Sequence, residues 1–539
     1  MVGITEPWFR HAVLYEIYLN SFYDSNGDGV GDLPGIIEKL DYLAGGEDSL
    51  GVDAIWITPF YPSPMVDSGY DITDYYSVDS SRGTLDDIKV LVAGCRKRGL
   101  KIFIDYIPNH TSDQHPWFQD SRSSRTARYR DWYVWRYPKA DGSPPNNWLS
   151  VFGGSAWQLD KKTNQYYLHS FLTSQPDLNW ENAEVRNEMK KALRFWLDIG
   201  VDGFRFDSTD YLAKDPLLRD DPPNKRLDKH KDRNPYHTLS HVHSRDGEKV
   251  YERLNDLTSV VAEYSGRFTV AENSPNKPDI NQYFKGFYDK IDHAVAAPFN
   301  FGPINAPWDA TYFSDFVGHF QSSLRGTSVP VYCFSNHDHE RIATRYGHEQ
   351  ARTAAMMILT LPGIAVIYNG DELGLADGRI GPRTAKDQFE RNEPGIGLGR
   401  DPERTPMPWT DGENAGFTTG KPWLPVASGY KTYNVEAQDK DPSSILNLHK
   451  RLIRFRKGST ALLTGSYHGL DLHPDVFSYT RRSDNEKLTI LLNFSARPVT
   501  IGREVSGQRA ILSTDINSPL PEVVNDHLTL KPHEGLILR

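Results

Sequence analysis

Short apolar runs alternate with amphipathic helical patterns through most of this 539-residue sequence, and no other feature restricts its fold so strongly. A strand pattern that repeatedly alternates with a helix pattern predicts a parallel α/β sheet, because each parallel crossover needs a long connection. Clear amphipathic stretches occupy 85–98 and 183–200. The chain length and the number of strands favour a closed (β/α)8 barrel over an open doubly wound sheet. The predicted buried strands are 13–19, 54–58, 102–107, 203–206, 268–271, 331–334 and 365–368.

The alternation is interrupted in two places, which predicts two further domains. A long aromatic and polar stretch follows the third strand and predicts a small inserted domain. Near the C-terminus the pattern changes to short strands with a period of two residues, which predicts an antiparallel β-sandwich. The predicted division is a barrel formed by 1–108 and 177–463, an inserted domain at 109–176 and a terminal sandwich at 464–539.

Composition excludes several classes of partner. The formal net charge of −10 argues against a nucleic-acid partner, because phosphate binding needs a basic surface. The two cysteines, Cys95 and Cys333, lie in apolar segments and are predicted to be buried thiols rather than a disulfide framework. The apolar run 354–368 contains Pro362 and Gly363, so it predicts a helix, a turn and a buried strand rather than a membrane span.

The first seven residues show neither the basic nor the apolar segment of a signal peptide, so we expect a cytoplasmic protein. No membrane partner is expected. The sequence leaves open whether the chain is a monomer or a homodimer.

Carboxylates follow four of the predicted strands. Asp105 lies at the end of the third strand, Asp207 follows the fourth, Glu272 the fifth, and Asp338 the strand at 331–334. A single Asp after a strand is commonly a helix cap or a turn residue. In a barrel, however, the carboxyl ends of all strands meet at one face, where active sites are built. Four carboxylates at that face therefore predict a common site.

Paired carboxylates at one face indicate glycoside hydrolysis. One carboxylate attacks the anomeric carbon while the other protonates the leaving oxygen, and a retaining enzyme holds the two about 5–5.5 Å apart. Crowding separates the pKa values of such a pair, and Arg205 would keep its neighbour Asp207 ionised. The residues alone leave Asp105 an equal candidate for either role.

The sequence resembles the α-amylase superfamily of glycoside hydrolases (family 13), and within it the α-glucosidase and oligo-1,6-glucosidase branch. The resemblance extends over nearly the whole chain, and its motifs together are far more specific than any one of them. They comprise Tyr15-Glu16-Ile17-Tyr18, Gly69-Tyr70-Asp71, the segment from Asp105 to His110, Gln175-Pro176-Asp177-Leu178-Asn179, the segment from Gly203 to Asp207, Glu272, Asn336-His337-Asp338 and the segment from Arg404 to Trp409.

The resemblance implies a role for each chemical residue. Asp207 would be the nucleophile and Glu272 the general acid/base, with Arg205 orienting Asp207. Asp338 would hold the 2- and 3-hydroxyls of the sugar and help to distort its ring. These roles move Asp105 to a supporting position beside His110.

The same resemblance implies the residues that bind the substrate. His110 and His337 would bind hydroxyls in the first subsite. Asp71 and Arg400 would clamp the 4-hydroxyl of the non-reducing glucose and close the pocket behind it. The expected activity is therefore that of a retaining, exo-acting α-glucosidase on short oligosaccharides or α-glucosides, with transglucosylation.

Two positions next to the chemical residues leave other activities open. Ser208 follows the nucleophile and Ala271 precedes the acid/base, where the branch usually carries other residues. Ser208 favours α-1,4 linkages or short substrates, whereas Ala271 also fits a trehalose synthase. A sucrose-active glucosyl-transferring relative is a further alternative. A non-catalytic amylase-like binding subunit is remote, because the carboxylates are intact.

A separate loop carries the pattern of a Ca²⁺-binding segment. Oxygen-bearing side chains alternate along 24–32, with glycines where the chain turns tightly. Gly35 stands where an EF-hand would have its bidentate Glu, so the loop is not a full EF-hand. The alternative is an Asx-rich turn without metal. The resemblance implies one structural Ca²⁺ or Mg²⁺, with Asp24, Asn26, Asp28 and Asp32 as side-chain ligands and Val30 as a carbonyl ligand.

Overall fold

Eight parallel strands form a barrel at the centre of the chain, seen here in a computed structural model that describes residues 7–227, 232–273, 280–381, 383–517, 519–520 and 523–539. The strands follow the order β10-β11-β1-β2-β3-β7-β8-β9. A parallel bridge between Asn300 and Tyr332 joins β9 to β10, and Asn300 N donates to Val331 O at 2.9 Å, which closes the barrel. The strands are β1 (Val13–Ile17), β2 (Ala54–Ile57), β3 (Lys101–Tyr106), β7 (Gly203–Phe206), β8 (Phe268–Ala271), β9 (Ala296–Pro298), β10 (Val331–Cys333) and β11 (Ile364–Tyr368).

The predicted (β/α)8 class is confirmed, and seven of the eight strands lie within two residues of their predicted bounds. The sequence did not reveal β9. This strand has three residues, two of them Ala, and is too short to show a periodicity. Leu19, predicted to end the first strand, begins the short helix α1 (Leu19–Phe22) instead.

Strand β7 directs polar side chains toward the inside of the barrel. Side chains alternate between the two faces of a strand, so Arg205 and Asp207 share the inner face. Phe204 and Phe206 face the outer layer and both contact the ring of Tyr106. Gly203 is required by close packing, because a Cβ there would lie 1.8 Å from the carbonyl oxygen of Phe268.

Helices cover the outside of the barrel. The predicted amphipathic stretches form α4 and α6, and α4 begins with a complete capping box between Thr84 and Asp87. Helix α6 ends at Gly200, whose φ of 114° is in the left-handed region that favours glycine. The main covering helices are α2 (Leu33–Glu38), α4 (Leu85–Lys97), α6 (Ala183–Ile199), α7 (Val250–Ala262), α8 (Ile280–Lys290), α9 (Ala310–Ser323), α11 (His348–Thr360) and α14 (Ile445–Gly458).

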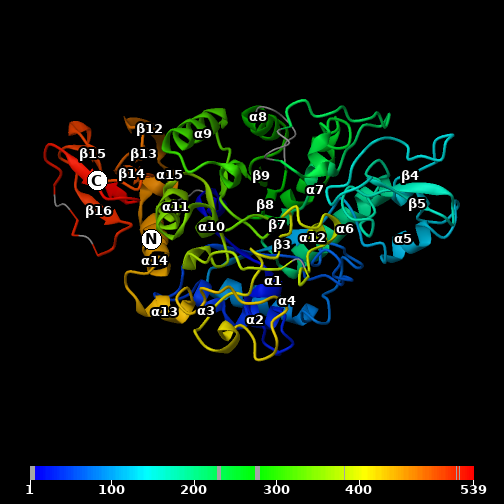
Figure 1. The fold of residues 1–539 in the computed structure, drawn as a ribbon, viewed down its shortest axis with the longest axis horizontal. Coiled ribbons are helices and arrows are strands. Elements are labelled where there is room, and N and C mark those ends of the chain that lie inside the picture. The colour runs from blue at the N-terminus through cyan, green and yellow to red at the C-terminus, as the bar shows by residue number, and fades with distance from the viewer. Residues whose placement is uncertain (1–6, 228–231, 274–279, 382, 518, 521–522) are drawn as a thin grey trace.

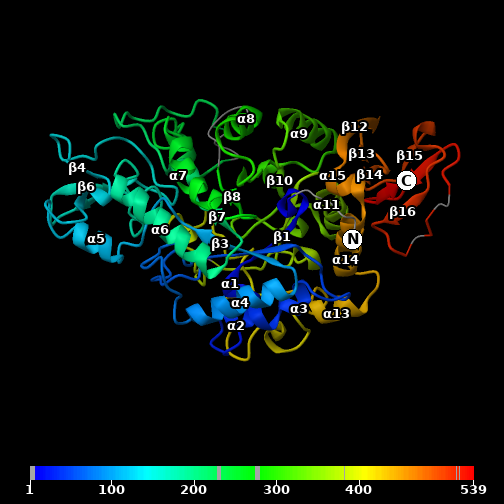
Figure 2. The ribbon, with the colours of Figure 1, turned by 180° about the vertical axis from the view of Figure 1, so that it is seen from behind.

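Two antiparallel regions lie at opposite ends of the long axis, with the barrel between them (Figures 1 and 2). A three-stranded sheet between β3 and β7 contains β4 (Trp135–Arg136), β6 (Gln165–Leu168) and β5 (Trp157–Asp160). It lies in the region predicted as an insertion.

The C-terminal region contains two sheets that share one core. Residues of both sheets, including Leu491, Ile501 and Leu530, belong to a single buried cluster, as the predicted sandwich requires. The larger sheet has the order β12 (Ser466–His473), β13 (Val476–Arg482), β14 (Lys487–Asn493), β18 (Gly535–Leu538) and β16 (Ala510–Ser513), and the smaller pairs β15 (Val499–Ile501) with β17 (Leu528–Leu530).

Two smaller expectations are tested by the fold. Cys95 and Cys333 are both buried and free. The apolar run at 354–368 forms the end of α11, a turn and β11, as predicted. Within the described ranges, no helix has the length and apolar character needed to cross a bilayer.

Candidate active site

A cavity of about 870 Å³ opens at the carboxyl ends of the barrel strands. Asp207, Glu272 and Asp338 all line it, although they come from three different strand ends. Aromatic side chains, including Phe152 and Phe171, form part of the wall. Because apolar rings beside convergent polar groups are typical of sugar sites, the cavity is the candidate active site.

Arg205 connects the carboxylates at the floor of this cavity. Its Nη1 donates to Asp207 Oδ1 at 2.7 Å and to Asp105 Oδ1 at 2.8 Å, and its Nη2 donates to the Glu272 carboxyl group. Asp105 is opposite Arg205 in the β3–β7 register and is fully buried. The predicted contact between Arg205 and Asp207 is therefore present. Asp105 has the supporting role predicted for it, and the side chain that it supports is Arg205.

The two carboxyl groups predicted to perform the chemistry have different pKa values. Burial raises the pKa of Glu272 to about 8 against the opposing charge of Arg205, and the negative charges of Asp207 and Asp338 add to the rise. Burial also raises the pKa of Asp207, but the opposing charge of Arg205 limits the value to about 6. Near pH 7, Glu272 is mostly protonated and Asp207 mostly ionised, which is the pairing that an acid and a nucleophile need.

Asp338 is kept ionised by arginines. Arg400 Nη1 lies 3.1 Å from Asp338 Oδ1, and Arg404 donates to the same oxygen at 2.5 Å. Burial alone would raise the pKa of Asp338, but the neighbouring His337 and the charges of Arg400 and Arg404 hold it well below its usual range. The residue therefore presents a permanent anion to the cavity.

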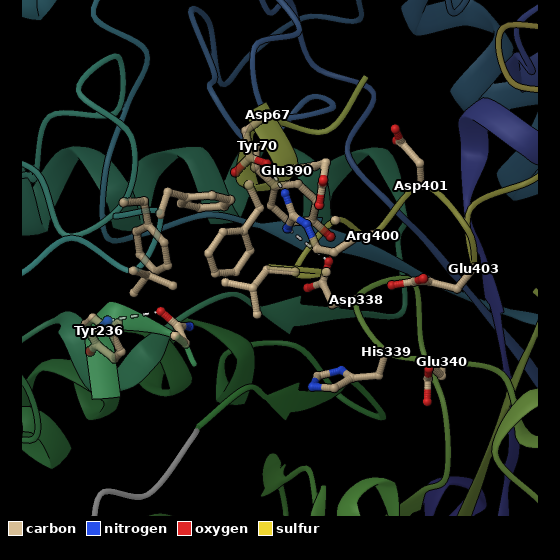
Figure 3. A pocket seen from close by; sticks show the side chains of 18 of the residues that line it. Asp67, Tyr70, Tyr236, Asp338, His339, Glu340, Glu390, Arg400, Asp401 and Glu403 are labelled. Atoms are coloured by element: carbon tan, nitrogen blue, oxygen red, sulfur yellow. Dashed lines mark hydrogen bonds and ion pairs between the residues drawn. The ribbon is translucent and has the colours of Figure 1, made fainter. Parts of the chain in front are cut away.

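The predicted clamp between Asp71 and Arg400 is wrong, because Asp67 takes the place of Asp71. Arg400 Nη2 lies 2.8 Å from Asp67 Oδ1, and Asp67 lines the cavity whereas Asp71 does not. Figure 3 shows Arg400 between Asp67 and Asp338. The Asp71 carboxylate is fully buried within its own loop, where it accepts hydrogen bonds from Ser63 Oγ and the main-chain N–H groups of Val66 and Asp67. It shapes the loop and does not reach the sugar cavity.

The two predicted histidines have different partners, Tyr70 for His337 and Gln175 for His110. His337 Nε2 is 2.8 Å from the Tyr70 hydroxyl, and the two rings are stacked at 5.6 Å. His110 lines the cavity, and Gln175 Nε2 lies 3.2 Å from its Nε2 and 2.9 Å from Asp67 Oδ2. Burial lowers the pKa of His110 to about 4, so its imidazole is neutral at pH 7.

Sequence reasoning missed Asp67 and Tyr70, and also Asp387, which pairs with Arg400 at 2.7 Å. Asp67 and Tyr70 stand in a loop after β2, where no periodicity tells which side chains point inward. The sequence did place two aspartates, Asp67 and Asp71, in one short segment with Tyr70, so either aspartate was a candidate partner for Arg400. Asp387 lies far from every strand end, so the strand-end argument could not find it.

Hydrogen bonds within the loop at 24–32 join the predicted metal ligands to one another. Asn26 N donates to Asp24 Oδ1 at 3.0 Å, and Asn26 Nδ2 donates to Asp32 Oδ2 at 3.2 Å. In the part of the chain that the structure describes, no three Asp, Glu, His or Cys side chains gather to hold a metal alone. The amide of Asn26 and the carbonyl of Val30 supply the further oxygens, so the donor set fits a hard cation such as Ca²⁺.

Comparisons with known proteins agree with this site. A family model described as "Alpha amylase, catalytic domain" matches residues 16–465. The chain is 38% identical over 527 residues to an oligo-1,6-glucosidase of Parageobacillus thermoglucosidasius, with 91% of each chain covered. It is 39% identical over 517 residues to a probable alpha-glucosidase of Rhizobium meliloti (strain 1021), with 92% of each covered.

A solved structure extends the similarity to the whole fold. The crystal structure of the alpha-glucosyl transfer enzyme XgtA matches with a TM-score of 0.92 at 38% identity, over 99% of both chains. The chain therefore belongs to the α-amylase family of glycoside hydrolases, within its α-glucosidase and oligo-1,6-glucosidase branch.

Proposed function

We propose that this enzyme is a retaining, exo-acting α-glucosidase that removes the terminal non-reducing glucose from short oligosaccharides or α-glucosides. The observation that carries the proposal is the cavity in which Asp207 and Glu272 have pKa values of about 6 and 8 beside the anionic Asp338. A carboxylate and a carboxylic acid at one strand-end face are the two groups that retaining hydrolysis requires.

The chemistry proceeds in two steps. A carboxylate oxygen of Asp207 attacks the anomeric carbon while Glu272 gives its proton to the departing glycosidic oxygen, leaving a glucosyl ester on Asp207. Glu272, now ionised, takes a proton from water, whose oxygen attacks the same carbon and releases Asp207. Two inversions return the α configuration. Asp338 would bind the hydroxyls of the sugar ring, and Arg205 holds Asp207 in place through the 2.7 Å bond.

The exo-acting character rests on the group of charges around Arg400. This side chain bonds Asp67, Asp338 and Asp387 at once, which fixes it at the wall of the cavity. Its guanidinium also lies 4.9 Å from the centre of the Phe152 ring. A salt-bridged wall of this kind would block the passage of a longer chain beyond the terminal sugar.

Glucosyl transfer is the second activity that we propose. It uses the same ester on Asp207, with a sugar hydroxyl in place of water. It is favoured by the match to the alpha-glucosyl transfer enzyme XgtA.

Product analysis tests the proposed function. We would incubate the purified enzyme with maltose, isomaltose, trehalose, sucrose and maltotetraose and separate the products by chromatography. Release of glucose from at least one disaccharide, and of glucose as the first product from maltotetraose, is expected. Maltose as the first product from maltotetraose, or no reaction with any of these sugars, would overturn the proposal.

We also propose that the loop at 24–32 binds one structural Ca²⁺ or Mg²⁺. Asp24, Asn26, Asp28, Val30 and Asp32 would hold it through oxygen atoms, the ligands that such hard cations prefer. The ion would stabilise the loop and would take no part in the reaction.

A further inference from the structure

A line of hydrogen bonds runs beneath the cavity from Glu16 to Asp105. Glu16 Oε1 lies 2.5 Å from His337 Nδ1, and His337 Nε2 lies 2.8 Å from the Tyr70 hydroxyl. Tyr70 then donates to Asp105 Oδ2 at 2.9 Å. Each of these side chains can donate only a fixed number of protons, so each proton can be assigned in turn along the line of hydrogen bonds.

The tyrosine fixes the direction of the line. A hydroxyl group has one proton, and Tyr70 gives it to Asp105, which is ionised above a pKa of about 6 and is bonded to Arg205 at 2.8 Å. Because the Tyr70 proton is already used, the hydrogen bond between Tyr70 and His337 needs a proton from the imidazole. His337 must therefore carry a proton on Nε2 and donate it to the Tyr70 oxygen.

The remaining choice concerns the proton between His337 and Glu16. Either His337 is a neutral imidazole that accepts from a protonated Glu16, or it is an imidazolium paired with a Glu16 carboxylate. Burial lowers the pKa of His337 well below its usual value and raises that of Glu16 well above its own. Both shifts favour the neutral pair.

The surroundings of Glu16 favour the same choice on geometric grounds. Glu16 lies on β1 between Trp56 of β2 and Tyr368 of β11, and its side chain is fully buried. Its Oε2 has no hydrogen-bond partner among the residues that the structure describes, and its one ion-pair contact there is with His337. A buried carboxylate oxygen without a donor is far more unfavourable than the carbonyl oxygen of a neutral acid.

We propose that Glu16 is a positioning residue that stays protonated and holds His337 as the neutral tautomer with its proton on Nε2. Glu16 Oε1 then serves twice, because it donates to His337 Nδ1 and also accepts from the main-chain N–H of His337 at 3.3 Å. The inference rests on the proposed glucosidase function only where activity is the readout.

Substitution of Glu16 separates the two proton arrangements. In E16Q the amide nitrogen can take the place of Oε1 and donate to Nδ1, as a protonated carboxyl group does, and it gives up only the long 3.3 Å bond from the His337 main-chain N–H. We expect kcat/KM for 4-nitrophenyl α-glucoside to stay within about threefold of wild type, with both limbs of its pH profile unmoved. E16L has no donor or acceptor and should lose at least about tenfold in kcat/KM, because the ring of His337 is no longer fixed.

An ionised Glu16 gives the opposite pattern. E16Q would then lose as much activity as E16L, and the acid limb of its pH profile would move, which would overturn the proposal. Thermal melting of each variant shows whether its loss of activity reflects unfolding instead.

A measurement on the wild-type protein does not depend on activity or on the folding of a Glu16 variant. Histidine labelled with ¹⁵N reports by NMR whether each ring nitrogen carries a proton, and H337Q assigns the signal. We expect Nε2 protonated and Nδ1 unprotonated from about pH 5.5 to 8. A proton on both nitrogens, or on Nδ1 alone, would contradict the inference even if the chain proved to have no glucosidase activity.

Discussion

Asp207, Glu272 and Asp338 are all carboxylic acids in one cavity, yet their surroundings give them different protonation. Arg205 contacts Asp207 at 2.7 Å, whereas Asp338 is held by Arg400 and Arg404. The sequence placed all three at strand ends correctly, because strand periodicity fixes which residue follows each strand. The sequence could not show that Arg400 pairs with Asp67 and not with Asp71, because these two aspartates lie in one loop without regular structure.

The pKa values predict the pH dependence of the reaction. As pH rises, kcat/KM should increase while Asp207 loses its proton near pH 6 and decrease while Glu272 loses its proton near pH 8. A bell-shaped profile with its maximum near pH 7 is expected from initial rates on maltose, whose leaving group needs the proton of Glu272. A rate that stays flat through pH 9 would show that Glu272 is not the acid.

A pair of loop variants tests the corrected clamp. D67A leaves Arg400 without its 2.8 Å partner and opens the sugar subsite, so kcat/KM should fall by about 30-fold or more. D71N keeps the shape of the loop side chain and touches no cavity atom, so its main effect should be a lower melting temperature. A larger loss of kcat/KM in a folded D71N than in D67A would restore the original assignment.

Among the elements, β7 and β8 act as one unit. Glu272 N donates to Phe206 O at 2.8 Å, and Thr209 N donates to Glu272 O at 3.0 Å. The turn begins at Ser208, whose φ of 47° lies in the left-handed region, so the chain doubles back onto the next strand. The sequence predicted both strands but not this link, because the pairing of two strand ends depends on their register.

Thr209 should position the acid through this link. Its Oγ1 donates to the Glu272 main-chain oxygen at 2.8 Å, and the side chain is fully buried and outside the cavity lining. T209V removes that bond, worth about 0.5–1.5 kcal/mol, and should lower kcat/KM about two- to tenfold on maltose, whose leaving group needs protonation. With 4-nitrophenyl α-glucoside the loss should be smaller.

T209S keeps the hydroxyl group and serves as the matched control, so it should recover most of the maltose activity. Equal losses on both substrates in T209V would indicate a general structural effect rather than a displaced acid.

Across the whole molecule, the loop at 24–32 joins distant parts of the barrel. Asp24 accepts from Thr418 Oγ1 at 2.5 Å, and Trp423 N donates to Gly29 O at 2.9 Å. The loop thus fastens the segment after β1 to the segment after β11. The sequence showed the oxygen-rich pattern, but these contacts span nearly four hundred residues and no local pattern encodes them.

If the loop binds a metal, chelation should loosen this connection. Dialysis against EDTA should lower the melting temperature, and added Ca²⁺ or Mg²⁺ should restore it, because a ligand that binds only the folded state stabilises it. D28N, whose side chain lies at the exposed edge of the loop, should reduce the effect of added metal. An unchanged melt together with no metal by elemental analysis would show that the loop is an Asx-rich turn.

The anomer of the first glucose released distinguishes a retaining mechanism from an inverting one. Proton NMR during the first minutes of hydrolysis, before mutarotation, distinguishes α-glucose from β-glucose. Attack by Asp207 followed by attack of water predicts α-glucose as the first product. β-Glucose as the first product would mean a single displacement and would contradict the assignment of Asp207 as nucleophile.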